Sequence, residues 1–495
     1  MNTESEMFGN DITRINLKVT ADAMRKILNL SNCSCRGLDG IPTENNVTIS
    51  GNNIELIFQS AYNESLGKYW MQSLPQYTIE SNGVSFNVPN GSSIFKGKLI
   101  VGCQDEMNLS ISLNVIEQPA LTDEHPHFWR YVYPVDTDEW FLQINAKPFR
   151  DDYGMVSCHG LLEIMLNSHK MRLYIKKLDD KHYMFIESMD RIIREDMDHS
   201  VDAIVISLGL ITGKQYGNFR FMFATDDYEF NTLTGQGLMH LLKSKKCPYQ
   251  IFDTNHTGVL EMLKRNDYQE YALEELKEEN ETESWHYDDQ PMQDYVFAKL
   301  TQLCYEKNDI MIASSMLIQG CLMPIEYQKA FYHVVLETIT SALMADDGFK
   351  APPPMRTHDY QEKVLPKLLD TLNSIDDIPG AAKDIYIKRL TNSLNNPANQ
   401  DKLIVLFEKC NYKLTENDHE AIKNRNKSFH GHLTDGKRDL YQQRNTFFAE
   451  SLRLHKLCCI LLLKAAGFKG QIFNNEVLFG IKEACERKEP PYIEI

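Results

Sequence analysis

The sequence predicts an α+β protein of several domains: a β-rich, sandwich or barrel-like region over residues 1–190, a mixed connecting region over 191–290, and an all-α bundle over 291–495. Three observations lead to this prediction. The chain has 495 residues, which is too long for one ordinary hydrophobic core. Its first half contains many short segments that alternate apolar and polar residues, whereas its last third places apolar residues at helical spacing.

Short strands are predicted throughout the first half. They alternate in polarity or are rich in β-branched and aromatic residues, and clusters of Asn, Gly and Ser separate them. The predicted strands are Ile15–Val19, Val47–Ser50, Ile54–Phe58, Val84–Val88, Phe95–Val101, Leu109–Ile116, Trp140–Ile144, Met171–Lys176 and Tyr183–Ile186. One early helix is expected over Ala21–Leu30. So many short strands with turns between them favour a sandwich or a barrel-like sheet.

The pattern changes after about Arg191. Val201–Leu210 is a largely apolar run, and Leu233–Lys246 suits a short helix or a loop. Glu270–Gln290 is dense in carboxylates. Such a charge run is usually a solvated helix face or a linker, so we place the main domain boundary there.

Helices are predicted after the acidic segment, from apolar residues at helical spacing. The predicted helices are Ile325–Leu343, Val364–Leu372, Asp384–Leu394, Lys402–Phe407, Asn417–His430 and Asp439–Ala466. Thr415 or Asn417 is placed to cap the helix that leads to His430, while Gly431 and Gly467 are placed to end the last two helices. Short connections between these helices predict an antiparallel bundle.

Composition and charge narrow the function. With 42% hydrophobic and 24% charged residues, the composition is typical of a soluble globular protein. The formal net charge of -17 argues against a protein that coats nucleic acid, so any RNA contact must be local. The eleven cysteines form no pair of CxxC sets, and we expect no metal and no cofactor. The first residues lack the features of a signal peptide, so we expect a cytoplasmic protein without membrane association.

One short segment reverses the local charge. Residues 423–432 read Lys-Asn-Arg-Asn-Lys-Ser-Phe-His-Gly-His, with three basic side chains and two histidines. Asn426 and His430 are four positions apart and would share a helix face, and the long side chain of Arg425 would reach that face. Lys423 and Lys427 add positive charge for RNA binding.

These residue types suit transesterification at an RNA phosphate, in which the 2'-hydroxyl is the nucleophile and no metal is needed. A histidine can take the hydroxyl proton or protonate the leaving oxygen. An arginine offers a planar fork to the phosphate and stabilises its developing charge. Asn426 would hold the imidazole or a phosphate oxygen. The segment from Arg194 to His199 has the same spacing, but its intervening carboxylates would repel phosphate.

The Arg425-Asn426-x-x-x-His430 signature resembles that of HEPN domains, and its surroundings resemble the Apea-like HEPN family. Tyr332–Thr340 is similar to an early bundle helix of that family, and Leu461–Gly470 is similar to the end of its last helix. The resemblance covers roughly residues 290–480, and the signature is its most specific part. It implies a metal-independent endoribonuclease of bacterial anti-phage defence, acting by abortive infection.

The same resemblance assigns roles to individual residues. It makes Arg425 and His430 the catalytic pair with Asn426 in support, while His432 also falls within the looser spacing that the family permits. Glu337 would either orient a histidine or pair with Arg425, the alternative being an ordinary surface carboxylate. HEPN nucleases pair two bundles around one cleft, which implies a homodimer. The β-rich region would sense a phage-derived trigger or restrain the bundle.

Two other hypotheses for the function stay open. The first is a non-catalytic HEPN module that uses the same basic site to hold a nucleotide, RNA or a partner enzyme. The second is a carbohydrate- or protein-binding β module whose helical half only dimerises.

Asp123–His127 carries side chains that metals favour, but its proline and close spacing suit a loop between strands.

Overall fold

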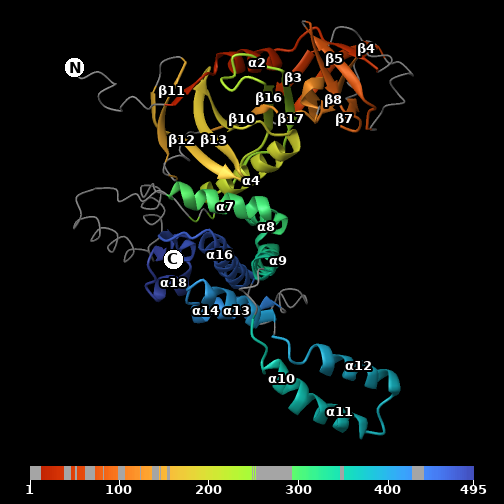
Figure 1. Cartoon of the computed structure of the whole chain (residues 1–495), viewed down its shortest axis with the longest axis vertical. Coiled ribbons are helices and arrows are strands. Elements are labelled where there is room, and N and C mark those ends of the chain that lie inside the picture. Colours follow the sequence, from red (N-terminus) through yellow and green to blue (C-terminus); the bar gives the residue numbers. More distant parts are fainter. Residues whose placement is uncertain are drawn as a thin grey trace, which may run out of the picture. The chain divides into compact units, whose positions relative to one another are not determined.

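The computed structural model describes most of the chain from Thr13 to Ile495. The residues outside the description are 1–12, 38–45, 51–52, 62–72, 82, 98–105, 123, 137–143, 145, 153–155, 248, 250, 252–291, 346–350, 398 and 426–439. The described residues divide into two compact units, one that ends at Glu306 and one that runs from Lys307 to Ile495 (Figure 1). Strands make up most of the first unit and helices most of the second, which confirms the α+β class.

A sheet of twelve strands forms the centre of the first unit. In sheet order the strands are β1 (Thr13–Ile15), β11 (Lys147–Asp151), β12 (Val156–Leu166), β13 (His169–Leu178), β14 (Lys181–Ser188), β10 (Phe128–Val135), β16 (Phe219–Thr225), β17 (Gly235–His240), β9 (Val115–Glu117), β6 (Val84–Val88), β5 (Tyr77–Ser81) and β2 (Ser34–Arg36). Only β1 and β11 pair in parallel among these described strands. The order is linear, so the described part of the sheet is open and does not close into a barrel.

Each face of this sheet carries a helix because successive residues of a strand point to opposite faces. Helix α2 (Lys18–Leu28) lies on the face of Arg130, which donates from Nη1 to the backbone oxygen of Asn16 at 2.9 Å. Helix α4 (Arg194–Thr212) lies on the face of the next residue, Tyr131, whose hydroxyl donates to Asp198 at 2.9 Å. The buried residues of α2 join the hydrophobic cluster on their side of the sheet.

A second sheet of four strands joins the same hydrophobic cluster. Its order is β3 (Asn46–Ser50), β4 (Asn53–Ala61), β8 (Glu106–Leu113) and β7 (Ser93–Gly97). Ile54 and Ile111 from this sheet are buried together with Ile79 and Phe86 from the larger one. The packing of two sheets at this end agrees with the sandwich-like part of the prediction.

The first unit extends beyond the boundary that the sequence predicts at residue 190. Strands β16 and β17 are hydrogen-bonded into the large sheet, although they fall in the predicted connecting region. Helix α7 (Asp294–Glu306) falls in the predicted bundle but packs against α4 and β12. The hydroxyl of Tyr305 accepts from Asn167 at 2.9 Å, and the backbone oxygen of Tyr305 lies 2.8 Å from Nε2 of His199. The acidic segment Glu270–Gln290 lies outside the described residues.

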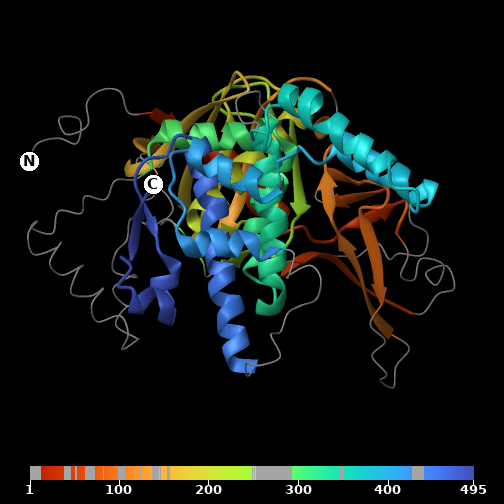
Figure 2. The ribbon, with the colours of Figure 1, turned by 90° about the horizontal axis from the view of Figure 1, so that it is seen from below.

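The second unit is helical. Its helices are α8 (Asn308–Gly320), α9 (Ile325–Met344), α10 (Thr357–Asp359), the π-helical turn η4 (Tyr360–Val364), α11 (Leu365–Asn373), α12 (Gly380–Asn392), α13 (Asn399–Lys409), α14 (Glu416–Lys423), α16 (Leu440–Ala465), α17 (Asn475–Leu478) and α18 (Lys482–Glu486). Helices α9 and α16 lie side by side along much of their length (Figures 1 and 2). A two-stranded sheet of β19 (Gln471–Phe473) and β20 (Tyr492–Glu494) follows α16.

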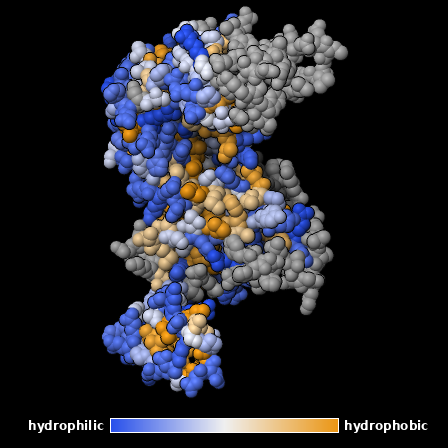
Figure 3. Space-filling model, turned by 90° about the vertical axis from the view of Figure 1, so that its right-hand side faces the viewer, coloured by the Kyte–Doolittle hydropathy of each residue, from blue (hydrophilic) through white to orange (hydrophobic). Residues whose placement is uncertain are grey.

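Within this unit, α10 to α12 form a helical hairpin. The hydroxyl of Tyr360 donates to the backbone oxygen of Leu390, and the Asn395 side chain exchanges hydrogen bonds with the backbone of Met355 at 2.8 and 3.0 Å. Helices α11 and α12 contain no buried residue, and large apolar side chains reach the surface of the hairpin (Figure 3).

Several predicted elements need correction. The predicted strand Ile15–Val19 is wrong in most of its length. Strand β1 already ends at Ile15, and helix α2 begins at Lys18. Leu233–Lys246, predicted as helix or loop, contains β17 and the short strand β18 (Lys245–Lys246). The predicted helix Asn417–His430 is interrupted, because α14 ends at Lys423 and Asn424 forms a turn.

Candidate functional site

Three polar residues form a line along α9. Lys329, His333 and Glu337 follow one another at intervals of four residues, which places their side chains on one face of a helix. Lys329 and His333 are buried, and the Glu337 side chain is 29% exposed. Buried charged and polar side chains require partners. The partner of Lys329 is Glu450 on α16, and the partner of Glu337 is Arg425, two residues beyond the end of α14.

Glu337 forms an ion pair with Arg425, the first residue of the predicted signature. Arg425 donates from Nη2 to Oε2 of Glu337 at 2.8 Å, and its Nε contacts Oε1 of the same carboxylate. The two contacts fix the plane of the guanidinium, as a fork-shaped pair does. Both side chains are about 30% exposed, so the pair lies at the edge of the bundle and not within its core. Of the two roles predicted for Glu337, the structure shows contact with Arg425.

Glu450 on α16 holds the residue that precedes Arg425. Its Oε1 accepts a hydrogen bond from Nδ2 of Asn424 at 3.0 Å, and its Oε2 contacts Nζ of Lys329. The side chains of Lys329 and Glu450 are only 10% and 13% exposed, so water screens this pair weakly. Asn424 and Arg425 are therefore tied to two different helices, immediately before the remainder of the signature.

His333 lies on α9 between Lys329 and Glu337 and is fully buried. Burial, with the positive charges of Lys329 and Arg425 nearby, lowers the pKa of His333 to about 3. The imidazole is therefore neutral at physiological pH. An uncharged ring at this position avoids adding a third positive charge between Lys329 and Arg425.

A second network anchors the start of α14. Thr415 caps the helix: its side chain accepts from the backbone N–H of Asp418, and the Asp418 side chain accepts from the backbone N–H of Thr415. Asp418 lies 3.6 Å from Nζ of Lys456, and the same ammonium lies 3.0 Å from Oε1 of Glu476. Arg453 also binds Glu476.

These buried charges compensate one another. The side chains of Lys456 and Glu476 are 6% and 2% exposed. Despite the cost of burial, the Glu476 carboxylate and Asp418 hold the pKa of Lys456 above its usual value. Lys456 and Arg453 in turn hold the pKa of Glu476 below its usual value. Both groups stay ionised, and α14 is fixed near its first turn as well as at its end.

The remaining predicted site residues are distributed as follows. The Lys423 side chain is exposed at the last residue of α14. Asn426, Lys427, His430 and His432 lie outside the described residues, and their roles stay predictions.

The second Arg-x-x-x-x-His segment has its own partners. Arg194 lies 2.8 Å from Glu117 and 3.5 Å from Asp198. Nε2 of His199 lies 2.8 Å from the backbone oxygen of Tyr305. Both side chains connect elements of the first unit.

The predicted loop Asp123–His127 also has a structural role in its described part. Nδ1 of His127 lies 3.1 Å from Asp226, and the ring contacts Trp129 edge-on at 5.9 Å between centroids. Across the described residues, no three His, Cys, Asp or Glu side chains gather as a metal site would require. Asp123 itself lies outside the description.

Sequence reasoning missed Lys329, His333, Asn424 and Glu450. The four-residue spacing of Lys329, His333 and Glu337 was a visible signal, because three polar residues on one face interrupt an otherwise apolar helix. No local signal marks Glu450 as the partner of Lys329 and Asn424.

Within the described ranges, no helix combines the length and the apolar character needed to cross a membrane. Comparisons with known proteins found no protein-family model, no curated protein and no solved structure that matches this chain.

Proposed function

We propose that this protein is a metal-independent endoribonuclease of the HEPN type, with Arg425 and His430 as its catalytic pair and Asn426 in support. The observation that carries the proposal is the placement of Arg425. Its guanidinium is oriented by Glu337, its side chain is 30% exposed, and it lies two residues beyond the end of α14. A partly exposed, oriented arginine suits the recognition of a phosphate from solution.

In the proposed reaction the 2'-oxygen attacks the adjacent phosphorus and the bond from phosphorus to the 5'-oxygen breaks. One histidine accepts the 2'-hydroxyl proton, and an acid returns a proton to the departing 5'-oxygen. Arg425 stabilises the charge that develops on the phosphate. The products are a 2',3'-cyclic phosphate and a 5'-hydroxyl, and the need for a 2'-hydroxyl restricts the substrate to RNA.

The resemblance supplies the biological part of the proposal. Two copies of the bundle would form a homodimer that brings both signatures to one cleft, so that His430 of each copy serves as acid or base. The enzyme would act in anti-phage defence by abortive infection, with the sheet-containing unit responding to a phage-derived trigger. His432 is the alternative to His430 as the working histidine, and Lys423 and Lys427 would bind the RNA backbone.

One observation favours a second candidate, a non-catalytic HEPN module that binds RNA or a nucleotide. Glu337 already engages Arg425 through two nitrogens, and a carboxylate beside the phosphate site lowers the affinity of that site for anions. A binding module tolerates such competition more easily than an enzyme that must stabilise extra negative charge.

Cleavage of labelled RNA by the full-length protein in EDTA separates the two candidates. We expect cleavage, and a loss of at least about a hundredfold in Arg425→Ala and in His430→Ala, since each removes a group that acts in the transition state. Matched controls are Arg389→Ala on α12 and His358→Ala on α10, both at exposed positions. Uncleaved RNA that still binds tightly would establish the binding module, and cleavage unaffected by both site variants would reject the proposed site.

A further inference from the structure

The first unit contains a polar cavity on the face of the sheet that α2 covers. Its volume is about 670 Å³, which lies in the range of small-molecule sites. It is lined by β1, β10, β11, β13 and β14, by the start of α2 and by the loop after β16. All of these elements belong to one compact unit. The cavity is distinct from the candidate site around Arg425.

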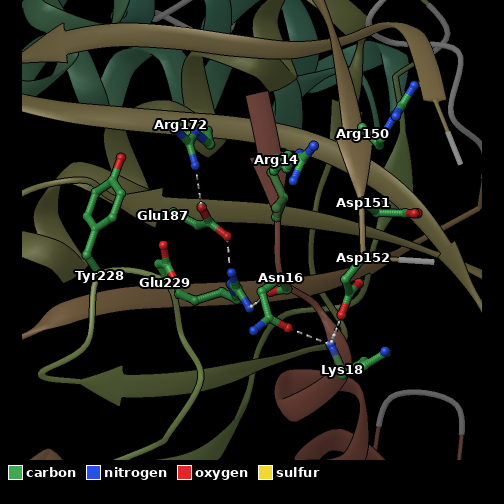
Figure 4. A pocket seen from close by; sticks show the side chains of 12 residues that line it. Arg14, Asn16, Lys18, Arg150, Asp151, Asp152, Arg172, Glu187, Tyr228 and Glu229 are labelled. Atoms are coloured by element: carbon green, nitrogen blue, oxygen red, sulfur yellow. Dashed lines mark hydrogen bonds and ion pairs between the residues drawn. The ribbon is translucent and has the colours of Figure 1, made fainter. Parts of the chain in front are cut away.

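A row of alternating charges forms its floor. Arg172, Glu187 and Arg130 stand opposite one another on the neighbouring strands β13, β14 and β10, and Glu163 on β12 continues the row beyond the cavity lining. Nε of Arg130 donates to Oε1 of Glu187 at 2.6 Å, and Nη1 of Arg172 lies 3.6 Å from the other oxygen of Glu187. Figure 4 shows the link between Arg172 and Glu187 as a dashed line.

Two buried arginines therefore share Glu187. The Arg130 side chain is 2% exposed and its guanidinium also stacks on Phe230, 3.9 Å from the ring centroid. The Arg172 side chain is 10% exposed, and its Nε has no hydrogen-bond partner among the described residues. A buried guanidinium donor without an acceptor is costly, and a ligand oxygen would satisfy it.

The rim of the cavity adds further positive charge. Arg14 and Lys18 are exposed, and no described residue pairs with the guanidinium of Arg14 or with the ammonium of Lys18. Arg150 lines the same cavity, so that five of the lining side chains are basic. This concentration of basic residues stands out in a chain with a formal net charge of -17.

The carboxylates of the cavity already have donors within the protein. Asp151 is paired with Lys176, which stands outside the lining. Oδ2 of Asp152 accepts from the backbone N–H of Lys18 at 3.0 Å, whereas its buried Oδ1 has no hydrogen-bond partner among the described residues, and Glu229 accepts from Asn231 at 3.2 Å. The lining therefore holds five basic side chains against four carboxylates, and Lys176 from outside the lining offsets the charge of Asp151, so the balance of charge that an incoming ligand meets is positive.

We propose that this cavity binds a small organic phosphate of nucleotide size. Its phosphates would contact Arg14, Lys18 and the buried guanidinium of Arg172. Tyr228, which is 49% exposed and stands across the view from Arg150 in Figure 4, offers a ring on which a planar base can stack. The proposal does not rest on the ribonuclease assignment, because every residue in it belongs to the other unit.

Isothermal titration of the full-length protein with ATP, GTP and inorganic pyrophosphate tests the proposal. We expect at least one of these probes to bind, and Arg14→Glu and Lys18→Glu each to weaken binding at least tenfold, because each replaces an attraction by a repulsion. The matched control is Lys26→Glu, an exposed lysine on the same helix outside the cavity, which should bind as the wild type does.

A second variant distinguishes the source of the phosphate. Tyr228→Ala should weaken nucleotide binding about tenfold through lost stacking and leave pyrophosphate binding unchanged. Circular dichroism of each variant checks that the fold is retained. The proposal is overturned if none of the three probes binds, or if binding survives both Arg14→Glu and Lys18→Glu in folded protein.

Discussion

Replacing Glu337 by glutamine keeps the shape of the side chain and removes its charge, so Glu337→Gln isolates the ionic part of the contact with Arg425. Two unit charges about 4 Å apart attract by about 4 kcal/mol at the effective dielectric of a protein surface. Measured pairs that water reaches are weaker, at about 1 kcal/mol or less. With both side chains about 30% exposed, we expect this pair to contribute about 1–2 kcal/mol.

If Glu337 orients Arg425 for the phosphate, the loss appears in the rate of cleavage. A loss of about 1–2 kcal/mol in transition-state stabilisation lowers the rate about 5- to 30-fold. The effect should fall on kcat more than on KM, because an unoriented guanidinium can still attract the RNA but stabilises the developing charge less well. Glu337 is in this sense a positioning residue.

Single-turnover cleavage of a short fluorogenic RNA, together with RNA binding measured by anisotropy, provides both quantities. The matched control is Glu326→Gln, which neutralises a carboxylate on the same helix. Glu326 pairs with Arg444, and their side chains are 40% and 60% exposed. We expect less than a twofold change there. A Glu337→Gln enzyme that cleaves as fast as the wild type would refute the positioning role, and a faster one would show that Glu337 restrains Arg425.

Three further predictions concern stability. Because the pKa of His333 is lowered to about 3, its contribution to stability is fully present above the unfolded-state pKa near 6.5 and is lost as pH falls toward 3. Between about pH 6 and pH 5, above the range in which carboxylates titrate, His333→Gln should reduce the pH slope of the urea unfolding free energy by about 1.4 kcal/mol per pH unit, and His358→Gln should leave this part of the slope in place. Lys456→Met removes the ammonium that lies beside both Glu476 and Asp418 and should lower the melting temperature of the helical unit. The expected loss is up to about 3 kcal/mol, less than for an uncompensated buried charge because Arg453 still binds Glu476; an unchanged melting temperature would mean that water reaches the network. Thr415→Ala removes the cap of α14 and should cost about 1 kcal/mol in urea unfolding, whereas Thr415→Ser should cost clearly less.

The sequence predicted the elements whose signal is local. Strand β6 occupies the predicted residues Val84–Val88, and α9 and α16 begin and end within one residue of their predicted bounds. In these segments the period of 2 or 3.6 residues is strong enough to determine the element, even though Lys329 and His333 interrupt the apolar pattern of α9.

The sequence missed strand β17 and the start of helix α2, which was predicted over Ala21–Leu30 and occupies Lys18–Leu28, because both depend on distant contacts. Strand β17 contains Gly235 and Gly237, which disfavour a strand prediction, yet an added Cβ at either position would lie 2.8 Å from the Leu121 side chain. Helix α2 starts at Lys18 instead of continuing a strand, and the backbone N–H of Lys18 donates to Asp152, 134 residues along the chain. Neither contact can be read from a sequence window.

In the candidate site too, some features are visible in the local sequence and others depend on distant contacts. The cluster of Arg425 and its basic neighbours is visible in the sequence because it reverses the charge of an acidic chain. The partners that orient it come from elsewhere, since Glu337 is 88 residues away and Glu450 belongs to the next described helix. Local spacing therefore indicated the chemistry, and tertiary packing supplies its positioning.

The chemical identity of the RNA ends tests the central claim most directly. RNA incubated with the full-length protein in EDTA should yield 5'-hydroxyl and 2',3'-cyclic phosphate ends, and a single 2'-deoxy substitution at the cleaved nucleotide should block cleavage there. Both Arg425→Ala and His430→Ala should abolish these ends. Products with 5'-phosphate ends, or cleavage at the 2'-deoxy position, would contradict a metal-independent transesterification at this site.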